Sequence, residues 1–564
     1  MAFILRQKNQ SGGVDLYYTV SRRIPGKKHP VQERKYLGKL DGESGELVKN
    51  RKIDRLSPEE LAALAAKGIA FRGRECPPPG RSPSGGASKR QLERWRSLEH
   101  GRVWALRSLA EGVGLMDALE TAFGKRLADR VFALAVFECV ENAAIYRAEN
   151  WLDGTILAEE GLDMSKSAVG RLVAEVGAEE PARNRFFQAW IKELGYPKAL
   201  IHDTTSISSY AERIDMIEYG YNRDREKLPQ LNFSMVYTAR EQLPLVYRLI
   251  PGSVPDVSTL TGTSRLLEAY GLKRFAYALD RGFYSKANLL LMLEKKIGFT
   301  IGAPLFPSDM KRLLAKHRGR LGRLESGLLV GDKTYRHSKD AYVLRREKGR
   351  GRPYKLGAHL FVDSKKRAYM TNELDTLLLL LRERFGKEDF STRAEALEWC
   401  ESNFPPKSGL YSVSRRRRAG KFQLAISEEA YRERIKNYGT FIILNSDPNE
   451  EALPTLFANK RRDAVEKMFD ILKNETPNRR LRVASDTNAH GKMFIAFVAV
   501  VLRTLMENRL RKHGMMNALT VNQSFDLLRK IRVAVTPNGE MAMQEVPSKT
   551  RKMLAALELE LPKM

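Results

Sequence analysis

Between residues 196 and 305 the apolar positions follow two different periods, and their succession predicts a mixed α/β domain. Short apolar runs typical of strands are followed by stretches with the 3.6-residue period of helices. The expected order is strand, strand, strand, helix, strand, helix, strand, over 199–203, 232–238, 245–250, 258–270, 275–280, 286–296 and 299–301. Three strands followed by alternating helices and strands predict one mixed sheet with helices packed against it.

The chain before this domain divides into three stretches of different pattern. Residues 1–75 combine strand-like alternation with a helix-like segment at 57–67, which predicts a small β-hairpin module plus a helix. Residues 76–88 are rich in Pro, Gly and Ser and predict a linker. Residues 89–195 have helical periodicity and are rich in Ala, Leu, Arg and Glu.

Three carboxylates are distinguished by their place in this pattern. Asp203 and Asp280 each end an apolar run expected to be a strand, the first and the fourth of the domain. Glu466 lies in the stretch 459–473, where an apolar stripe at helical spacing opposes a polar arc of about 60°. The stripe consists of Val465, Met468, Phe469 and Leu472, and the arc of Asn459, Arg462, Glu466 and Lys473. Two strand-borne carboxylates and one helix-borne carboxylate are typical ligands of two Mg²⁺ ions about 4 Å apart in phosphoryl transfer.

Other interpretations of these residues remain open. Either aspartate alone is also typical of a strand end or a helix cap. Asp463 and Asp470 share the polar face with Glu466, so periodicity alone admits either as the third ligand. The spacing of the neighbouring Arg and Lys favours Glu466.

Around the carboxylates the sequence resembles bacterial insertion-sequence transposases with a DDE triad on an RNase H-like fold, in the group with the signature Y-x2-R-x3-E-x6-K, similar to insertion-sequence family four. Arg462, Glu466 and Lys473 match that signature at its spacing, whereas Asn459 stands at the tyrosine position. The phrases Asp203-Thr-Thr-Ser and Asp280-Arg-Gly-Phe look like the family's first two motifs, and the turn 252–256 looks like the one between them. The resemblance spans roughly residues 195–505.

This resemblance implies an RNase H-like catalytic domain in two parts, 196–305 and 438–515. Asp280 and Glu466 are 466 − 280 = 186 positions apart, too far for a loop in a compact domain. We therefore expect an inserted domain of mixed strands and helices at 306–437, and a polar C-terminal tail at 516–564.

The resemblance also implies an activity and its partners. Asp203, Asp280 and Glu466 would hold two Mg²⁺ or Mn²⁺ ions, and the enzyme would cut DNA at the ends of its element and join the freed 3′-hydroxyl to target DNA. The expected partners are both double-stranded DNAs and a second copy of the chain, in a homodimeric synaptic complex. Residues expected to contact DNA near the site are Arg281, Asn459, Arg462 and Lys473.

A transposase needs a module that finds its element's ends, and 89–195 is the candidate for a helical DNA-end-binding region. Within it, the segment 165–172 has small polar residues followed by Arg171, as at the start of helices that enter the major groove. An ordinary capped helix in a bundle accounts for the same pattern, and both interpretations stay open.

Charge gives independent support for a polyanionic partner. The chain has 97 Lys and Arg against 68 Asp and Glu, a net charge of +29, far beyond what solubility requires. The densest basic run consists of Arg415, Arg416, Arg417 and Arg418, and such runs bind phosphate backbones without reading sequence.

The remaining composition fits a nucleoid-associated protein of the reducing cytoplasm. Three dispersed cysteines are too few for a disulfide framework. The longest uninterrupted apolar run, 493–502, is shorter than the roughly 20 residues that cross a bilayer, so we expect no membrane partner.

Two other functions remain compatible with the sequence. One is a metal-dependent nuclease on the same fold that cuts DNA without strand transfer. The other is a non-catalytic DNA-binding protein descended from a transposase, which the departure at Asn459 would allow.

Overall fold

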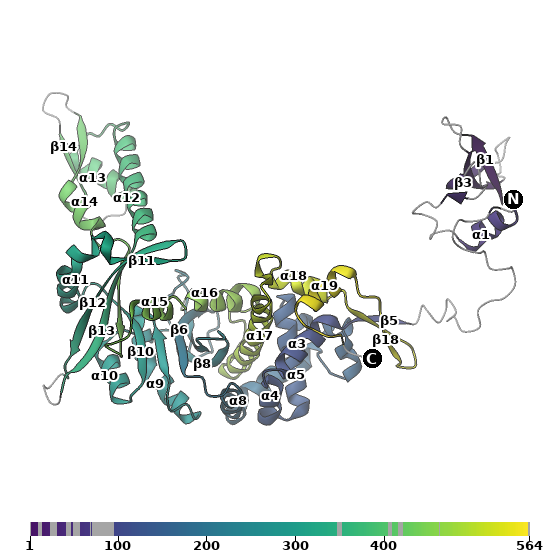
Figure 1. The fold of residues 1–564 in the computed structure, drawn as a ribbon, viewed down its shortest axis with the longest axis horizontal. Coiled ribbons are helices and arrows are strands. Elements are labelled where there is room, and N and C mark those ends of the chain that lie inside the picture. Colours follow the sequence, from purple (N-terminus) through teal and green to yellow (C-terminus); the bar gives the residue numbers. More distant parts are fainter. Residues whose placement is uncertain are drawn as a thin grey trace. The chain divides into compact units, whose positions relative to one another are not determined.

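The structure is a computed structural model that describes residues 2–8, 14–22, 31–40, 47–48, 57–67, 69, 95–346, 352–403, 409–415, 421–461 and 463–561. It gives the backbone alone at 2, 22, 48, 58–61 and 463–466. The chain forms two compact units, Met1–Arg94 and Trp95–Met564 (Figure 1). The predicted linker 76–88 lies outside the described residues.

The first unit is a small antiparallel sheet with one helix. Its strands, in spatial order, are β1 (Ala2–Lys8), β2 (Val14–Arg22), β3 (Val31–Leu40) and β4 (Leu47–Val48). Helix α1 (Pro58–Ala65) contributes Leu64 to a core that also contains Leu16, Leu37, Leu47 and Ile69. The strand-like alternation and the helix-like segment seen in the sequence are both present, because each places apolar side chains on the same small core.

The second unit is built on one large mixed sheet, as the pattern between 196 and 305 predicts. The strands are β6 (Ala199–Ser208), β7 (Gln230–Thr238), β8 (Pro244–Pro251), β9 (Ala276–Leu279) and β10 (Gly298–Ala303). Helices α9 (Asp256–Ala269) and α10 (Lys286–Glu294) connect the last three of these strands. All seven predicted elements are found. β6 lies between antiparallel β7 and parallel β9, so the first and fourth strands are neighbours.

Four further strands extend this sheet beyond β10. They are β16 (Thr440–Asn445), β13 (Tyr354–Asp363), β12 (Lys333–Leu344) and β11 (Gly327–Val330), and the complete order is β11-β12-β13-β16-β10-β9-β6-β7-β8. The expectation that 306–437 forms one inserted domain therefore differs from the structure, in which β11 to β13 belong to the central sheet. β16 pairs with both β10 and β13, so the returning strand is what joins the insertion to the sheet.

The rest of the insertion forms an arm beyond the sheet (Figure 1). It contains α12 (Ser364–Phe385), α13 (Arg393–Asn403), β14 (Tyr411–Arg415), β15 (Phe422–Ile426) and α14 (Glu428–Ile435). Two small apolar clusters, separate from the main core, hold these elements together. The arm is mixed rather than all-β, as the sequence predicts.

Helices cover both the sheet and the long helix α17 (Asp486–Lys512). The helical region before β6 contains α3 (Gly101–Glu111), α4 (Leu115–Phe123), α5 (Lys125–Glu141), α7 (Lys166–Ala178) and α8 (Glu180–Glu193). α17 is long and apolar enough to cross a membrane, but 94% of its apolar window is buried inside the protein. It is the central helix of the core.

The segment 165–172, for which the sequence allows two interpretations, forms the first turns of α7. Ser165 caps that helix by accepting a hydrogen bond from the backbone N–H of Ala168. α7 packs backbone to backbone on α17, since a Cβ at Gly491 would lie 1.8 Å from the carbonyl oxygen of Val173. These contacts are those of a capped bundle helix, while Arg171 on the outer face pairs with Asp163. Recognition of DNA ends by 89–195 stays a prediction.

The C-terminal residues expected to form a polar tail are folded. They contain α18 (Val521–Leu528), β17 (Arg532–Val535), β18 (Met541–Met543) and α19 (Ser548–Ala556). β17 pairs with β5 (Arg96–Glu99), so the C-terminal segment packs against the first residues of the second unit. Val521, Phe525 and Leu528 are buried at helical spacing in α18, and Val533 and Val535 are buried in alternation in β17, so the pattern here is that of the elements found.

Candidate active site

The two aspartates lie at the same level on neighbouring parallel strands. The pairing of β6 with β9 ends at His202 opposite Leu279, and the next residues along the chain are Asp203 in β6 and Asp280 directly after β9. Neighbouring strands lie about 4.8 Å apart, so 77 positions of sequence, 280 − 203, separate residues that are adjacent in the fold. Because side chains alternate along a strand, Asp203 and Asp280 occupy the same face of the sheet.

Asp203 is half-buried in this row. The backbone N–H of Thr204 donates to its Oδ1 at 2.8 Å. On the neighbouring strand, burial raises the pKa of the Tyr237 hydroxyl well above its ordinary value, and the negative charge of Asp203 raises it further. Tyr237 therefore stays neutral beside the carboxylate.

Asp280 is placed by the turn that follows β9. It caps a short helical turn, Arg281–Phe283, and the N–H of Arg281 donates to its Oδ1 at 2.5 Å. The side chain of Arg281 is exposed. At Gly282 a Cβ would lie 3.2 Å from a carboxylate oxygen of Asp256, so the small residue of the second motif lets the start of α9 approach the turn.

His202, the residue before Asp203, belongs to the opposite face and to the core. Its ring is fully buried, contacts Phe283 at 4.6 Å between centroids, and its Nε2 lies 2.7 Å from the hydroxyl of Ser234. Burial lowers the pKa of His202 to about 3, and the charge of Arg248 acts in the same direction. It is a neutral packing residue.

The predicted helix 459–473 is interrupted, and this part of the sequence-based geometry is wrong. α15 (Ala452–Lys460) ends before α16 (Asp463–Asp470), and a π-helical turn, Ile471–Glu475, follows. An arc computed at 100° per residue holds only within one regular α-helix, because a π turn adds a residue and changes the direction of the side chains beyond it. Asn459 therefore does not share a continuous helix with Lys473.

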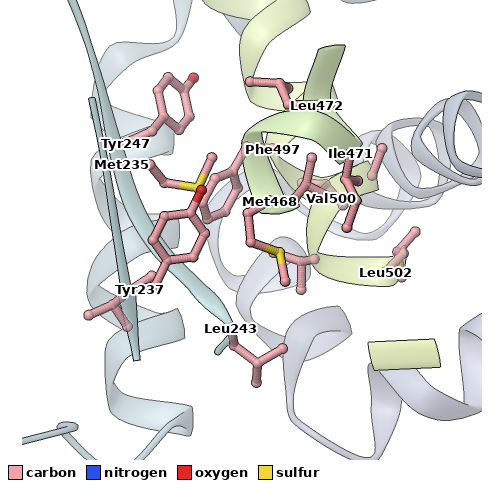
Figure 2. Packing of buried hydrophobic residues seen from close by; sticks show 14 of the residues in the cluster. Met235, Tyr237, Leu243, Tyr247, Met468, Ile471, Leu472, Phe497, Val500 and Leu502 are labelled. Carbon is pink, nitrogen blue, oxygen red and sulfur yellow. The ribbon is translucent and has the colours of Figure 1, made fainter. Parts of the chain in front are cut away.

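Three of the four residues of the predicted apolar stripe are described, two in α16 and Leu472 in the π turn, and the side chain of Val465 lies outside the described residues. Met468, Phe469 and Leu472 are buried, and the ring of Phe469 lies 6.3 Å from that of Tyr237. Figure 2 shows Met468 beside Tyr237 and Phe497. Because Met235 and Tyr237 lie on the same sheet face as Asp203, α16 covers the face that carries both aspartates.

The third predicted ligand is placed by its backbone alone. Glu466 lies in α16, two residues before Met468, and its side chain is outside the described part of the chain, as is the whole of Arg462. Among the described residues no group of three or more His, Cys, Asp or Glu is arranged to hold a metal ion. The structure thus brings Asp203, Asp280 and α16 together without testing the triad itself.

Lys473 follows α16 and forms an ion pair with the loop between β6 and β7. Its Nζ donates to Oδ2 of Asp224 at 2.6 Å. Burial lowers the pKa of this lysine, and the bond to Asp224 opposes that shift. The sequence predicted Lys473 as a DNA contact but contained no signal for its partner, which is 249 positions away.

The same loop contacts both carboxylate-bearing regions through alternating charges. Arg223 pairs with Asp256 beside the turn after Asp280, and Glu226 pairs with Arg480 beyond the π turn. The hydroxyl of Ser208 at the end of β6 also donates to Glu226 at 2.7 Å. These ion pairs fix the loop at the edge of the candidate site.

A basic cavity lies just beyond α16. It has a volume of about 710 Å³ and is lined by Lys473, Arg479, Arg480, Arg482, Lys492 and, from the helical region, Tyr146 and the residues before it. Its described lining contains no carboxylate. Arg479 and Arg482 are exposed, and no ion pair involves them among the described residues.

One lining residue of this cavity, Lys492, belongs to a buried polar group. Lys492 faces Glu138, whose carboxylate accepts a hydrogen bond from the side chain of Asn478 at 3.0 Å. Burial raises the pKa of Glu138 to about 7 and lowers the pKa of Lys492. Arg479 and Arg482 are thus the exposed cations of the described lining, whereas Lys492 is buried.

The remaining predicted contacts lie elsewhere. Arg415 is in the arm, with its guanidinium 5.8 Å from the ring of Phe422, and Arg416, Arg417 and Arg418 lie outside the described residues. Asn459 is in the last turn of α15, near exposed Phe457. Arg479, Arg480 and Arg482 were not singled out from the sequence, although they form a visible basic run.

Comparison with protein-family models gives no match, and comparison with curated proteins gives none. Among solved structures, the chain is similar to a piggyBac transposase in a synaptic complex with hairpin DNA, determined by cryo-EM. The two share 10% sequence identity with a TM-score of 0.35, over 72% of this chain and 70% of that chain. At that TM-score the likeness supports no inference about function.

Proposed function

We propose that the protein is a DNA transposase whose second unit contains an RNase H-like catalytic domain. The observation that carries this proposal is the position of Asp203 and Asp280, level with each other on parallel neighbouring strands, on the face that α16 covers. A single strand-end carboxylate commonly has only a structural role. Two in one row beside a helix that brings a third are what metal-dependent phosphoryl transfer requires.

The residues present fit a pair of divalent cations. Asp203 and Asp280 are half-buried carboxylates of adjacent strands, and hard cations such as Mg²⁺ prefer carboxylate oxygens. Glu466 in α16 would supply the third carboxylate. The ions, when bound, would lower the pKa of water and stabilise the leaving oxygen of a phosphodiester.

The basic cavity gives the DNA a path away from this site. Arg479 and Arg482 are exposed cations that form no ion pair among the described residues, on the segment that follows α16. Such groups contact phosphates without reading bases. Lys473 would position the loop 209–229 through Asp224, while Arg281 is exposed next to Asp280. Recognition of element ends by 89–195, with two copies of the chain in the synaptic complex, completes the proposal.

The test is a strand-transfer assay with the purified full chain. The substrate is linear DNA that ends in the short inverted repeats flanking the reading frame, with a supercoiled plasmid as target. Joined products that form with Mg²⁺ or Mn²⁺, and disappear with excess chelator, are expected. Ca²⁺, which is larger and less strict in geometry, should allow assembly without efficient cutting.

The two other functions give different products. Metal-dependent cutting that never yields joined DNA would identify a nuclease. Specific binding of the repeats with no cutting in any metal would identify a non-catalytic DNA-binding protein, and full activity in chelator would refute the metal mechanism.

A further inference from the structure

The loop 209–229 exposes three tyrosine rings at the edge of the candidate site. Tyr210, Tyr219 and Tyr221 are 73%, 74% and 82% exposed. Within the described residues, the side chains of Tyr219 and Tyr221 make no hydrogen bond or ring contact. Single exposed aromatic residues are common, but a group of them on one short segment typically marks a binding surface.

The backbone that carries Tyr219 and Tyr221 is fixed on both sides. Glu218 and Gln230 exchange two backbone hydrogen bonds of 2.9 Å, and the carbonyl of Tyr221 accepts one from the side chain of Gln230, also at 2.9 Å. Gly220 lies between the tyrosines and packs on the turn after β8, where a Cβ would be 1.9 Å from the carbonyl oxygen of Gly252. The rings are thus presented on a preorganised support, which lowers the entropy lost on binding.

The loop 209–229 contacts the start of α9, the π turn after α16 and a residue that lines the basic cavity. Shortly after Tyr221, Arg223 pairs with Asp256 at the start of α9, and Asp224 pairs with Lys473 after α16. Tyr210 lies 5.7 Å from the guanidinium of Arg480, which lines the basic cavity. One exposed ring of the loop, Tyr210, therefore lies beside a cation that lines the basic cavity.

We propose that Tyr219 and Tyr221 form a stacking surface for unpaired bases of a DNA strand whose phosphates occupy the basic cavity. Aromatic rings beside a positive groove are the arrangement by which proteins bind single-stranded nucleic acid without base readout, since every base has a face that can stack. The inference rests on the proposed function, because cutting at a DNA end exposes unpaired bases. The two rings would also provide an aromatic surface, which the side chain of Asn459, at the tyrosine position of the signature, lacks.

The test measures binding of the full chain, in chelator, to a fluorescent oligothymidine of roughly 20 nucleotides and to a duplex of unrelated sequence. Tyr219→Ala with Tyr221→Ala should weaken single-strand binding by about 5- to 150-fold, the range for loss of one stacked base. Tyr219→Phe with Tyr221→Phe should bind like the parent, because the rings remain. Duplex affinity should change less than about twofold, since phosphate contacts dominate it.

Two further measurements separate stacking from phosphate contacts and from a general loss of surface aromatic residues. The slope of log affinity against log salt should be equal in the parent and the double alanine variant, because stacking releases no counterions. Tyr369→Ala removes a ring that is 63% exposed on α12 and should leave single-strand binding unchanged.

Single-strand binding by the double alanine variant within about twofold of the parent would overturn the inference. So would a phenylalanine variant as weak as the alanine variant, because hydroxyl groups would then carry the binding. Since binding is measured without metal, loss of stacking with intact cleavage would remove this inference alone. Normal stacking without any cleavage would remove the proposed function alone.

Discussion

Adjacent polar residues on the two faces of β6 lie in opposite environments. On one face His202 is sealed against Phe283 and Ser234 and is kept neutral by burial. On the other face Asp203 stays half-buried, level with Asp280, under α16. A one-residue step along a strand therefore separates a core residue from a candidate ligand, which shows that strand alternation, and not residue type, assigns the chemistry here.

This difference has an energetic reason. A buried imidazole can remain uncharged by shifting its pKa, at a moderate free-energy cost. Two carboxylates one strand apart cannot both be ionised in a dry core, so a row that carries two aspartates must remain accessible to water, cations or basic side chains. The open face is consequently where phosphates and metal ions can be held.

The largest effect is expected when the open face loses a carboxylate. Asp203→Ala or Asp280→Ala should each reduce DNA cleavage by about 1,000-fold or more, because each removes a metal ligand. Binding of DNA should remain close to the parent, since other groups contact the phosphates. Cleavage rates and duplex affinity are measured in parallel.

The matched control for these variants is Asp117→Ala, an exposed aspartate of α4. It should cut DNA like the parent. Near-parental cleavage by either strand variant would place that aspartate outside the site and remove the contrast between the faces. Glu466→Ala is tested in the same assay. If this variant cuts DNA like the parent, Asp463 or Asp470 becomes the candidate for the third metal ligand.

A second effect concerns the cations beyond α16. Arg479→Ala with Arg482→Ala should lower the slope of log affinity against log salt by about 1.8, since each phosphate contact releases about 0.9 counterions. At 0.1 M salt this corresponds to a loss of affinity of about 60-fold. Duplex binding is titrated at several salt concentrations.

Arg240→Ala with Arg529→Ala removes two exposed arginines away from the cavity and is the matched control. An equal slope in both double variants would show that the cavity does not hold DNA. The part of the open face that contacts DNA would then be limited to the region of Asp203 and Asp280.

The sheet was predictable from sequence because local pattern determines it. The runs at 199–203 and 275–280 are apolar, end in an aspartate and are connected in the order that places β6 beside β9. The apolar spacing of Met468 and Phe469 in α16, continued by Leu472 in the π turn, likewise identified the buried side of this segment.

What the sequence could not predict depends on contacts between distant segments. The break between α15 and α16 follows a run of residues that favour helices, so composition contains no stop signal there. The pairs Lys473–Asp224 and Arg480–Glu226 join positions about 250 apart. Likewise, β11 to β13 have ordinary strand patterns, and only their pairing through β16 assigns them to the central sheet.

The smallest expected effect tests the sealed face. The unfolded chain binds a proton at His202 near pH 6.5, whereas burial lowers the folded pKa to about 3. The stability that neutral His202 contributes is therefore complete above pH 6.5 and is lost as the pH falls toward 3. At pH 5 this one residue should destabilise the parent by about 2 kcal/mol relative to pH 7.

His202→Gln retains a polar side chain opposite Ser234 but cannot titrate. Its stability should fall less than that of the parent between pH 7 and pH 5, by about 2 kcal/mol, whatever its absolute stability. Urea unfolding of both proteins at pH 5, 6 and 7 gives this difference directly. An identical pH dependence would mean that the imidazole is reached by water in the folded state, and the two faces of β6 would then not differ as the structure indicates.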